Sequence, residues 1–238
     1  MTGLSVKDIT YRYGAKTALD GVSFDIPQGA FCALLGPNGA GKSTLFSLLT
    51  RLFVAPVGQI DVAGHNLARD PRAALAKLGI VFQQPTLDLD LSVRQNLSYF
   101  AALHGLSGRE SRTRIDSSLE RLDMLPRAHE KARSLNGGHR RRAEIARALI
   151  HTPSVLLLDE PTVGLDAAAR AAITGHVHRL AQDGTTILWA THLTDEVWPG
   201  DQLVVLHHAK VLAQGIASQI AGDMPLRDRF LAMTAAPA

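Results

Sequence analysis

The feature that most constrains this chain is a glycine-rich segment at residues 34–50, LLGPNGAGKSTLFSLLT. The spacing G-x-x-x-x-G-K-[S/T], typical of a phosphate-binding loop, is filled by Gly36, Gly41, Lys42 and Ser43. A triphosphate needs many hydrogen-bond donors without steric bulk, and glycines let backbone N–H groups curl around its oxygens. An apolar strand precedes the loop and an apolar helix follows it. The sequence therefore predicts a nucleotide site rather than an ordinary glycine turn.

The residue types in this loop suit an anion with a bound cation. The helix that opens at Lys42 points the positive end of its dipole at the anion, and Lys42 adds a mobile charge for the β- and γ-phosphates. The hydroxyl of Ser43 suits Mg²⁺. The residues of the loop that we expect to bind nucleotide are Gly36, Asn38, Gly39, Ala40, Gly41, Lys42, Ser43 and Thr44.

Composition limits the remaining possibilities. The 238 residues, 46% hydrophobic and 20% charged, are enough for one sizeable core, either a large α/β domain or a domain with an inserted lobe. A net charge of +3 argues against bulk nucleic-acid binding, so no nucleic-acid partner is expected. The single cysteine, Cys32, rules out an intrachain disulfide and fits a reducing compartment. We find neither a signal peptide nor 18 consecutive apolar residues, so the chain is expected in the cytosol, with any membrane role through a partner.

The hydrophobic pattern divides the chain into a body and a helical insertion. Residues 4–11 and 18–26 alternate apolar and polar, as half-buried antiparallel strands do. A nucleotide-binding α/β core with a β subdomain is predicted over residues 1–84 and 151–222, and a helical subdomain over 85–150. Residues 223–238 are left as a C-terminal tail.

Local signals set the expected elements inside these parts. Ser92 and Gln95 form a capping box for a helix to about His104, and a charged helix follows over 109–122. Asn136 opens a helix with an apolar stripe. The other expected elements are helices at 71–78 and 167–182, strands at 59–62, 79–82, 155–158 and 185–190, and a hairpin-like pair at 203–206 and 210–213.

Two acids follow the fully apolar run 155–158, which is typical of a central parallel strand. They would lie at the carboxyl edge of the sheet beside the phosphate-binding loop. Asp159 can hold Mg²⁺ through water, and Glu160 can orient or deprotonate an attacking water. The alternative is that both acids merely cap a strand.

Two further polar residues also end strands. His192 is placed to reach a γ-phosphate, although a lone histidine is usually a surface or core residue. The amide oxygen of Gln83 can ligate Mg²⁺. Considered without the other motifs, however, Gln83 is more simply interpreted as an ordinary surface residue.

Three features have two interpretations each. Asp166 is a good helix N-cap whatever else it does. The arginines 140–142 could attract phosphate, but neighbours on a helix point in different directions, so a solvated or salt-bridged face is favoured. The pair 207–208, both histidine, lies at an expected turn, and we do not expect a metal site there.

Taken together, these segments resemble a known family. The order GPNGAGKS, VFQQ, LNGGHRRR, LLLDEPTVGLD and ATH is similar to the ATP-binding cassette of ABC transporters, over nearly the whole chain. The resemblance implies an α/β fold, a RecA-like P-loop NTPase core with an antiparallel β subdomain and an inserted helical subdomain. It also implies ATP hydrolysis, with Mg²⁺ held by Ser43, Gln83 and Asp159.

The resemblance also suggests roles for single residues. Tyr13 matches the aromatic that stacks on adenine, Gln83 the glutamine that senses Mg²⁺ and the permease, and His192 the switch histidine. The signature loop is matched by Asn136, Gly137, Gly138 and His139, and the D-loop aspartate by Asp166. In that family two domains pair head to tail, and each signature loop closes on the ATP of the other protomer.

This chain departs from the family pattern at two positions of the signature loop. The usual serine is replaced by Asn136 and the usual glutamine by His139, and both replacements can still hydrogen-bond. The GG-x-RRR pattern and the segment TLDLDLSVRQNLSYFAALHGL are most similar to exporter-type cassettes with separate permeases. They also resemble a bacterial group associated with pyrroloquinoline-quinone-dependent alcohol oxidation.

The main expectation is therefore the ATPase subunit of a transporter. It would act as a homodimer at the cytoplasmic face of the inner membrane, bound to a separate permease. Residues 84–91 would transmit to that permease whether the phosphate site is occupied. The alternative is a soluble ABC ATPase in assembly or repair, which shares every hydrolytic motif. A GTPase switch would need an N-K-x-D motif, and the sequence has none. The transported cargo is not encoded in this chain.

Overall fold

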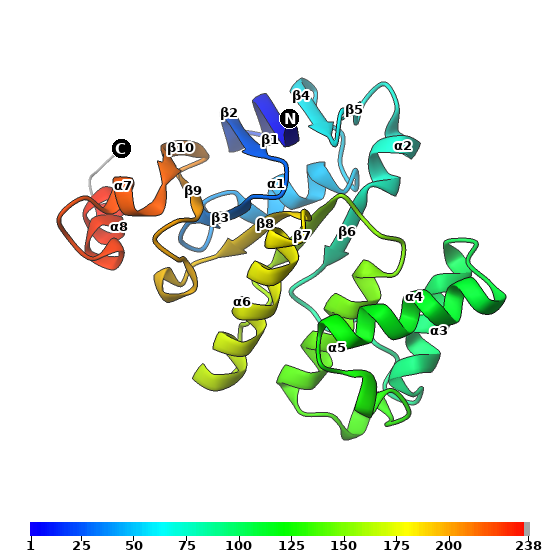
Figure 1. Ribbon diagram of the computed structural model, residues 1–238. Coiled ribbons are helices and arrows are strands. Elements are labelled where there is room, and N and C mark those ends of the chain that lie inside the picture. Colours follow the sequence, from blue (N-terminus) through cyan, green and yellow to red (C-terminus); the bar gives the residue numbers. More distant parts are fainter. Residues whose placement is uncertain (236–238) are drawn as a thin grey trace.

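Two β-sheets organise residues 1–235, the part of the chain described by the computed structural model (Figure 1). The six-stranded sheet has the order β10–β9–β3–β8–β7–β6, in which all neighbours are parallel except the β9–β10 pair. Its strands are β3 (Phe31–Leu35), β6 (Leu78–Val81), β7 (Val155–Asp159), β8 (Thr186–Thr191), β9 (Gln202–His207) and β10 (Lys210–Ile216).

The smaller sheet is antiparallel, in the order β2–β1–β4–β5. Its strands are β1 (Thr2–Tyr13), β2 (Lys16–Pro27), β4 (Val57–Val62) and β5 (His65–Asn66). The antiparallel β1–β2 pair confirms the alternation seen in the sequence, although both strands extend beyond the expected 4–11 and 18–26.

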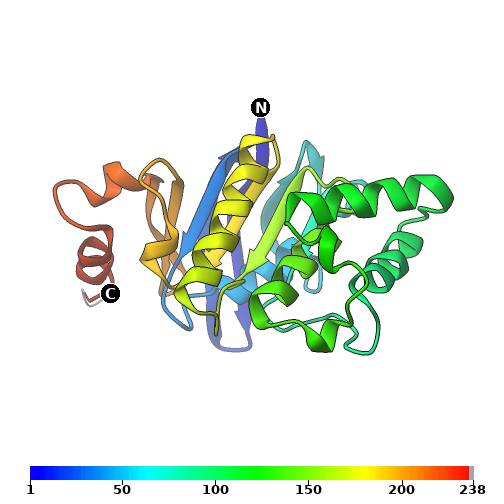
Figure 2. The same cartoon turned by 60° about the horizontal axis from the view of Figure 1, so that its bottom comes forward.

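Helices cover both faces of the six-stranded sheet. The α-helices are α1 (Lys42–Leu49), α2 (Pro71–Ala76), α3 (Val93–Leu103), α4 (Gly108–Arg121), α5 (Gly137–Leu149), α6 (Ala167–Gln182), α7 (Ala217–Ala221) and α8 (Leu226–Ala235). Short 3₁₀ turns lie at Leu125–Arg127, Ala132–Ser134 and Thr194–Glu196. Helices α3, α4 and α5 form a lobe on one side, whereas α6 crosses the front of the sheet (Figures 1 and 2).

The central strand β3 shows how the core is divided. All five of its residues are buried, and successive side chains point to opposite faces of the sheet. Phe31, Ala33 and Leu35 pack in a cluster with residues of the helical lobe and α6. Cys32 and Leu34 pack in a second cluster with α1 and the antiparallel sheet. Burial on both faces is what holds the phosphate-binding loop, which follows β3, in a fixed place.

Several helix ends agree with the local signals in the sequence. The capping box of Ser92 and Gln95 is present in both directions, and Asn136 accepts a hydrogen bond from the backbone N–H of His139 at 2.8 Å. Asp166 likewise caps α6. Other boundaries were wrong: α2 ends at Ala76 rather than at residue 78, and β6 runs over 78–81 rather than 79–82.

The C-terminal segment holds an element that we did not anticipate, because α8 spans most of the tail assigned to 223–238. Residues 236–238 of that tail lie outside the described residues. Within residues 1–235, the helices are too short or too polar to cross a lipid bilayer.

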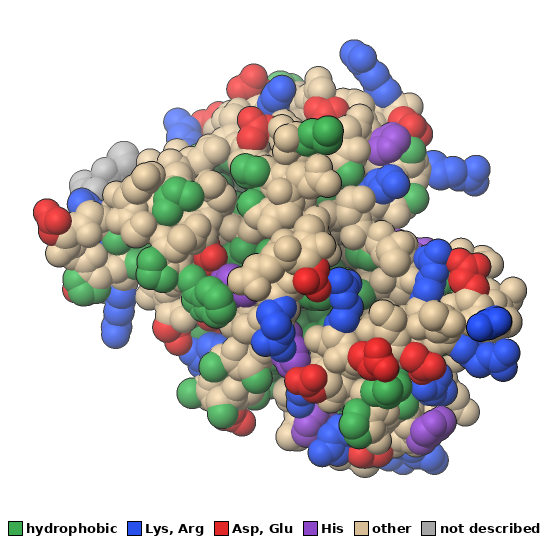
Figure 3. Space-filling view, viewed as in Figure 1, with side chains coloured by type: hydrophobic (Ala, Val, Ile, Leu, Met, Phe, Trp, Pro, Cys, Tyr) green, Lys and Arg blue, Asp and Glu red, His purple; other side chains and the backbone are tan. Residues whose placement is uncertain are grey.

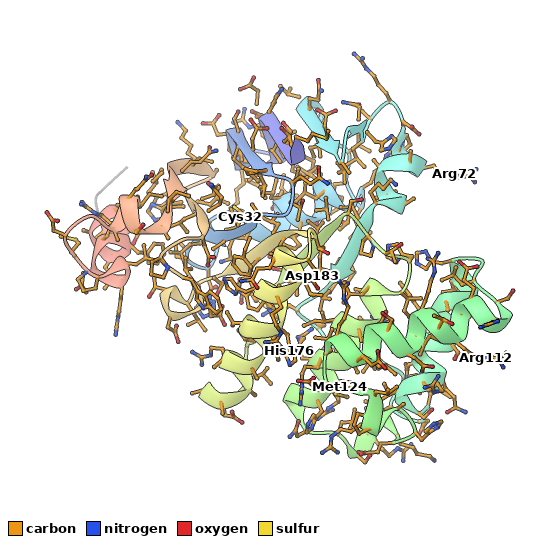
Figure 4. All side chains as sticks on the ribbon, in the orientation of Figure 1. Cys32, Arg72, Arg112, Met124, His176 and Asp183 are labelled. Carbon is orange, nitrogen blue, oxygen red and sulfur yellow. The ribbon has the colours of Figure 1, made fainter. Side chains whose placement is uncertain are left out.

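The helical lobe is tied to the body through α6. His176 on α6 lies 3.5 Å from Asp123, which follows α4, and Arg121 pairs with Asp183 at 2.9 Å (Figure 4 labels His176 and Asp183). On the face shown in Figure 3, acidic and basic side chains are interspersed over the lobe.

Candidate functional site

The functional candidates converge because parallel strands end at the same edge of the sheet. The phosphate-binding loop follows β3, Glu160 follows β7, His192 follows β8 and Gln83 lies two residues beyond β6. In the sheet register, Leu35 pairs with Thr191 and Asp159 pairs with Ala190. The sheet itself thus brings residues that are more than 100 positions apart to one edge.

The glycines of the loop are required by close backbone contacts. A Cβ atom at Gly36 would collide with the carbonyl oxygen of Leu206. Gly41 has a φ of 117°, in a region that favours glycine, and a Cβ there would lie 2.6 Å from the carbonyl oxygen of Ala18. The loop can therefore wrap tightly in front of α1 only with glycine at these two positions.

Three charged or polar side chains meet in front of this loop. Lys42 Nζ donates to the carbonyl oxygens of Gly36 at 2.6 Å and Pro37 at 3.3 Å. The same ammonium lies 3.3 Å from Glu160 Oε1, and that oxygen lies 3.4 Å from His192 Nδ1. One carboxylate oxygen is thus shared between a lysine and a histidine from two other segments.

The backbone of Glu160 is itself unusual. Its φ is +44°, which is rare for a residue with a side chain, and such conformations cluster at functional sites. The backbone N–H of Glu160 donates to the carbonyl oxygen of Ala190 at 3.0 Å, so β8 holds the residue in this conformation.

A pocket of about 700 Å³ opens in front of these groups. Of the residues expected from the sequence, it is lined by Tyr13, Asn38, Gly39, Gly41, Lys42, Ser43, Thr44, Gln83, Glu160 and His192. Tyr13 Oη lies 3.5 Å from Thr44 Oγ1. Gly36, Ala40 and Asp159 do not line the pocket. The carbonyl oxygen of Gly36 accepts from Lys42 Nζ, and that of Ala40 accepts from the backbone N–H of Ala209 at 3.2 Å.

Sequence reasoning missed part of this pocket. Residues 16–18 of β2, Val163, and the hairpin residues His208 and Ala209 also line it. A turn was expected at 207–208, but His207 ends β9 and the turn lies at 208–209. Nothing in the sequence indicated that β9 lies next to β3 and brings this turn against the phosphate-binding loop.

The donor atoms near the loop fit a magnesium ion. Ser43, Gln83 and Asp159 offer hydroxyl, amide and carboxylate oxygens, the hard ligands that Mg²⁺ prefers. Burial raises the pKa of Asp159, the nearby Glu160 raises it further, and Lys42 and Arg141 oppose the shift. A divalent cation beside this buried carboxylate would offset the cost of its negative charge.

The segment after β6 is anchored to α5 by buried charges. Arg141, in the middle of the arginine run, is 7% exposed and donates to the carbonyl oxygens of Phe82 and Gln83, both at 2.7 Å. It pairs at 2.8 Å with Glu144, which also accepts from the backbone N–H of Thr86 at 2.6 Å. Of the two interpretations of the run, the salt-bridged one holds for Arg141, but its guanidinium is buried rather than solvated.

The residues matched to the signature and D-loops form a separate surface. Asn136, Gly138, His139 and Asp166 line a second pocket, of about 250 Å³, and none of them lines the pocket at the phosphate-binding loop. Gly138 packs against Ala169 at the start of α6, where a Cβ would lie 3.0 Å from the Ala169 side chain. Burial, together with Arg127 and Arg142, lowers the pKa of His139.

Comparison with known proteins decides the family. The family model described as "ABC transporter" matches residues 19–163, which contain the loop, Gln83, the signature segment and Glu160. The chain belongs to the ABC transporter ATP-binding family. It is an ABC ATPase, and ATP is the nucleotide that this family binds and hydrolyses.

Several curated cassettes are similar over most of this chain. A daunorubicin resistance ATP-binding protein, DrrA3 of Streptomyces coeruleorubidus, is 39% identical over 93% of this chain and 71% of its own length. The linearmycin resistance ATP-binding protein LnrL of Bacillus subtilis is 35% identical over 92% of this chain and 72% of its own length. The Nod factor export ATP-binding protein I of Ralstonia nicotianae is 38% identical over 89% of this chain and 66% of its own length. The cassette thus spans about two thirds to seven tenths of these relatives.

Solved structures confirm the predicted fold. The cassette cbiO1 from Clostridium perfringens, part of the ABC transporter complex cbiONQ, superposes with a TM-score of 0.84 at 32% identity, over 92% of this chain and 90% of its own. A cassette solved as a dimer in a post-hydrolysis state with ADP and Pi gives a TM-score of 0.76 at 28% identity. The match covers 90% of this chain and 98% of that cassette.

Proposed function

We propose that this ABC ATPase hydrolyses Mg·ATP in the 700 Å³ pocket, as a head-to-tail homodimer, and drives export through a separate membrane permease. The observation that carries the proposal is the shared contact of Glu160 Oε1 with Lys42 and His192 in front of the phosphate-binding loop. In this proposal the attacking water and the γ-phosphate of ATP meet beside the Glu160 carboxylate.

Each side chain at the pocket has a distinct task in this proposal. Lys42 and the loop N–H groups neutralise and hold the phosphates. Glu160 orients the attacking water and accepts its proton, and His192 contacts the γ-phosphate while fixing the Glu160 carboxylate. Tyr13, which is 45% exposed and lines the pocket, offers its ring to adenine.

A magnesium ion would be held by Ser43, Gln83 and Asp159 together with the phosphates. When bound, it neutralises charge on the phosphates and fixes their orientation. The chain's own contribution is to present these oxygens at one edge of the sheet.

The homodimer is supported by the separation of the two pockets. Asn136, Gly138 and His139 surround a helix N-terminus, which is suited to bind an anion, yet they do not line the pocket of their own chain. A second protomer would bring this helix end to the ATP, as the dimeric state of the solved relative suggests.

Transport is supported by the relatives, whose names describe drug resistance and Nod factor export. An exporter cassette would bind its permease and so lie at the cytoplasmic face of the inner membrane. The exposed Leu89, in the segment 84–91, is the candidate contact with the permease. Leu87, in the same segment, is buried and packs in the core, so it is not a candidate for this contact. The link to alcohol oxidation stays a prediction.

The hydrolysis part is tested with Glu160→Gln, which keeps the shape of the side chain but removes the base. Turnover should fall by roughly 10²–10⁴-fold while ATP still binds. The exposed Glu120→Gln, on α4, is the matched control and should keep parental turnover. Near-parental ATPase activity of Glu160→Gln would contradict the role of this carboxylate.

The transport part is tested by cell fractionation with and without a co-expressed candidate permease. Membrane recovery that depends on the permease, and that weakens in Leu89→Ser, supports an exporter subunit. Recovery in the soluble fraction under both conditions would favour the alternative, an ABC ATPase in assembly or repair.

A further inference from the structure

A buried carboxylate lies behind the two residues that face the pocket. Glu196, in the 3₁₀ turn after β8, is only 1% exposed, although a lone carboxylate is rarely buried without partners. It accepts three hydrogen bonds from other segments. Trp189 Nε1 donates to Oε2 at 3.0 Å, Thr191 Oγ1 donates to the same oxygen, and Thr162 Oγ1 donates to Oε1.

These donors connect Glu196 to both residues of the proposed catalytic pair. Thr162 lies two positions after Glu160, in the segment that leaves β7. Thr191 is the residue before His192, and its hydroxyl also accepts from the backbone N–H of Leu193, the residue after, at 3.0 Å. The backbone on both sides of His192 is therefore held by one hydroxyl that is itself fixed by Glu196.

We propose that Glu196 is a positioning residue that sets the distance between Glu160 and His192. The inference rests on the proposed function, in which these two side chains act on ATP. The 3.4 Å contact between Glu160 Oε1 and His192 Nδ1 joins two side chains that follow the paired strands β7 and β8. Glu196 holds one segment with each carboxylate oxygen and so keeps both in register, without itself reaching the pocket.

The link to Glu160 is tested at Thr162, which is 2% exposed. Thr162→Val keeps the shape and removes the donor, whereas Thr162→Ser keeps the hydroxyl. We expect the valine variant to lose about 10-fold or more in kcat, since small misplacements near the chemistry cost up to ~10²-fold. Its KM for Mg·ATP should stay near the parental value, and the serine variant should restore kcat.

Thr174→Val is a matched control. Thr174 is 4% exposed on α6, and its hydroxyl has no hydrogen-bond partner among the described residues. The same isosteric change therefore removes no hydrogen bond, and kcat should stay parental. Melting temperatures of all variants are recorded, and kinetics are measured where all are folded.

The link to His192 is tested in the same way with Thr191→Val and Thr191→Ser. The inference predicts that both valine variants lose kcat selectively and that both serine variants recover it. Parental kcat in both valine variants would overturn the inference while leaving the proposed function intact. A joint loss of kcat and melting temperature in valine and serine variants alike would also overturn it, by showing a role in packing alone. If the parent did not hydrolyse ATP, the proposed function would fail first, and the positioning role would fail with it.

Discussion

Arg141 on α5 donates from Nη2 to the carbonyl oxygen of Gln83 at 2.7 Å. This contact joins the helix that begins at the signature loop to the segment that follows β6. Arg141 is held in place by Glu144, which is 2% exposed and binds Thr86 on the same segment. The helical lobe and the Gln83 segment are therefore joined through α5 by buried polar contacts.

Removing Arg141 should destabilise the fold. Arg141→Met would leave Glu144 buried without its cation, a change that costs roughly 3–5 kcal/mol for buried pairs. Arg140→Met is the control, since the described residues give Arg140 no ion pair. Urea unfolding at constant pH measures both free energies. A loss below about 1 kcal/mol for Arg141→Met would contradict a buried, paired arginine.

This pair marks a limit of what the sequence could predict. Three adjacent arginines present three directions around a helix, and only the packing of α5 against the Gln83 segment selects the one that is buried. The burial of Glu144 gives no signal either, because only its partner Arg141 is near in sequence, whereas Thr86 is 58 residues away. Glu196 was also missed, because its partners Trp189 and Thr191 lie on β8 and its third partner, Thr162, lies 34 residues away in sequence.

What the sequence could predict were features with local causes. The glycine spacing, the capping box at Ser92 and the N-caps at Asn136 and Asp166 depend on neighbouring residues, and all are present. The apolar runs predicted the parallel strands of the core. Because Glu160 and His192 follow two of these strands, the sequence also predicted that both lie at the same edge of the sheet. The roles of the site residues and the domain boundaries stay predictions.

Asp159→Asn should raise stability while removing function. Burial raises the pKa of Asp159 in the folded state, so its contribution to stability is present below the unfolded pKa of about 3.9 and is lost as the pH rises through the folded pKa. At pH 7.5 the charged form opposes folding, and the neutral amide of the variant would remove that cost. Thermal unfolding without Mg²⁺ or nucleotide should show a higher Tm at pH 7.5 and little gain near pH 4. A lower Tm at pH 7.5, or full Mg·ATP hydrolysis, would contradict this account.

His151 should make stability depend on pH. Burial lowers the pKa of His151, and the hydrogen bond to the Leu78 carbonyl opposes this shift. His104, whose ring stacks on His151, and the positive charge of Arg114 lower the pKa further. The unfolded chain then takes up the proton first, so stability is lost as the pH falls through about 6.5 towards the folded pKa.

The corresponding variant is His151→Gln, whose amide can still donate to the Leu78 carbonyl. The unfolding free energy should fall less steeply between pH 7.5 and 5.5 than in the parent, although not to zero slope, because burial also lowers the pKa of His104 and His176. The exposed His129→Gln controls for the effect of a histidine-to-glutamine change on the unfolding free energy at pH 7.5. Equal slopes for His151→Gln and the parent would exclude this histidine as the cause.

The head-to-tail site is tested most directly at Asn136, in a Glu160→Gln background that retains ATP. Asn136→Ser should dimerise with ATP like its parent, because serine and asparagine are comparable N-caps. Asn136→Glu would place a carboxylate against the triphosphate, and like charges about 4 Å apart repel by roughly 4 kcal/mol at an effective dielectric of 20. Analytical ultracentrifugation should therefore show a nearly thousandfold weaker ATP-dependent dimer, with nucleotide affinity of the monomer unchanged because the phosphate-binding loop is untouched. Normal ATP-dependent dimerisation of Asn136→Glu would mean that this loop does not face the γ-phosphate of a second protomer.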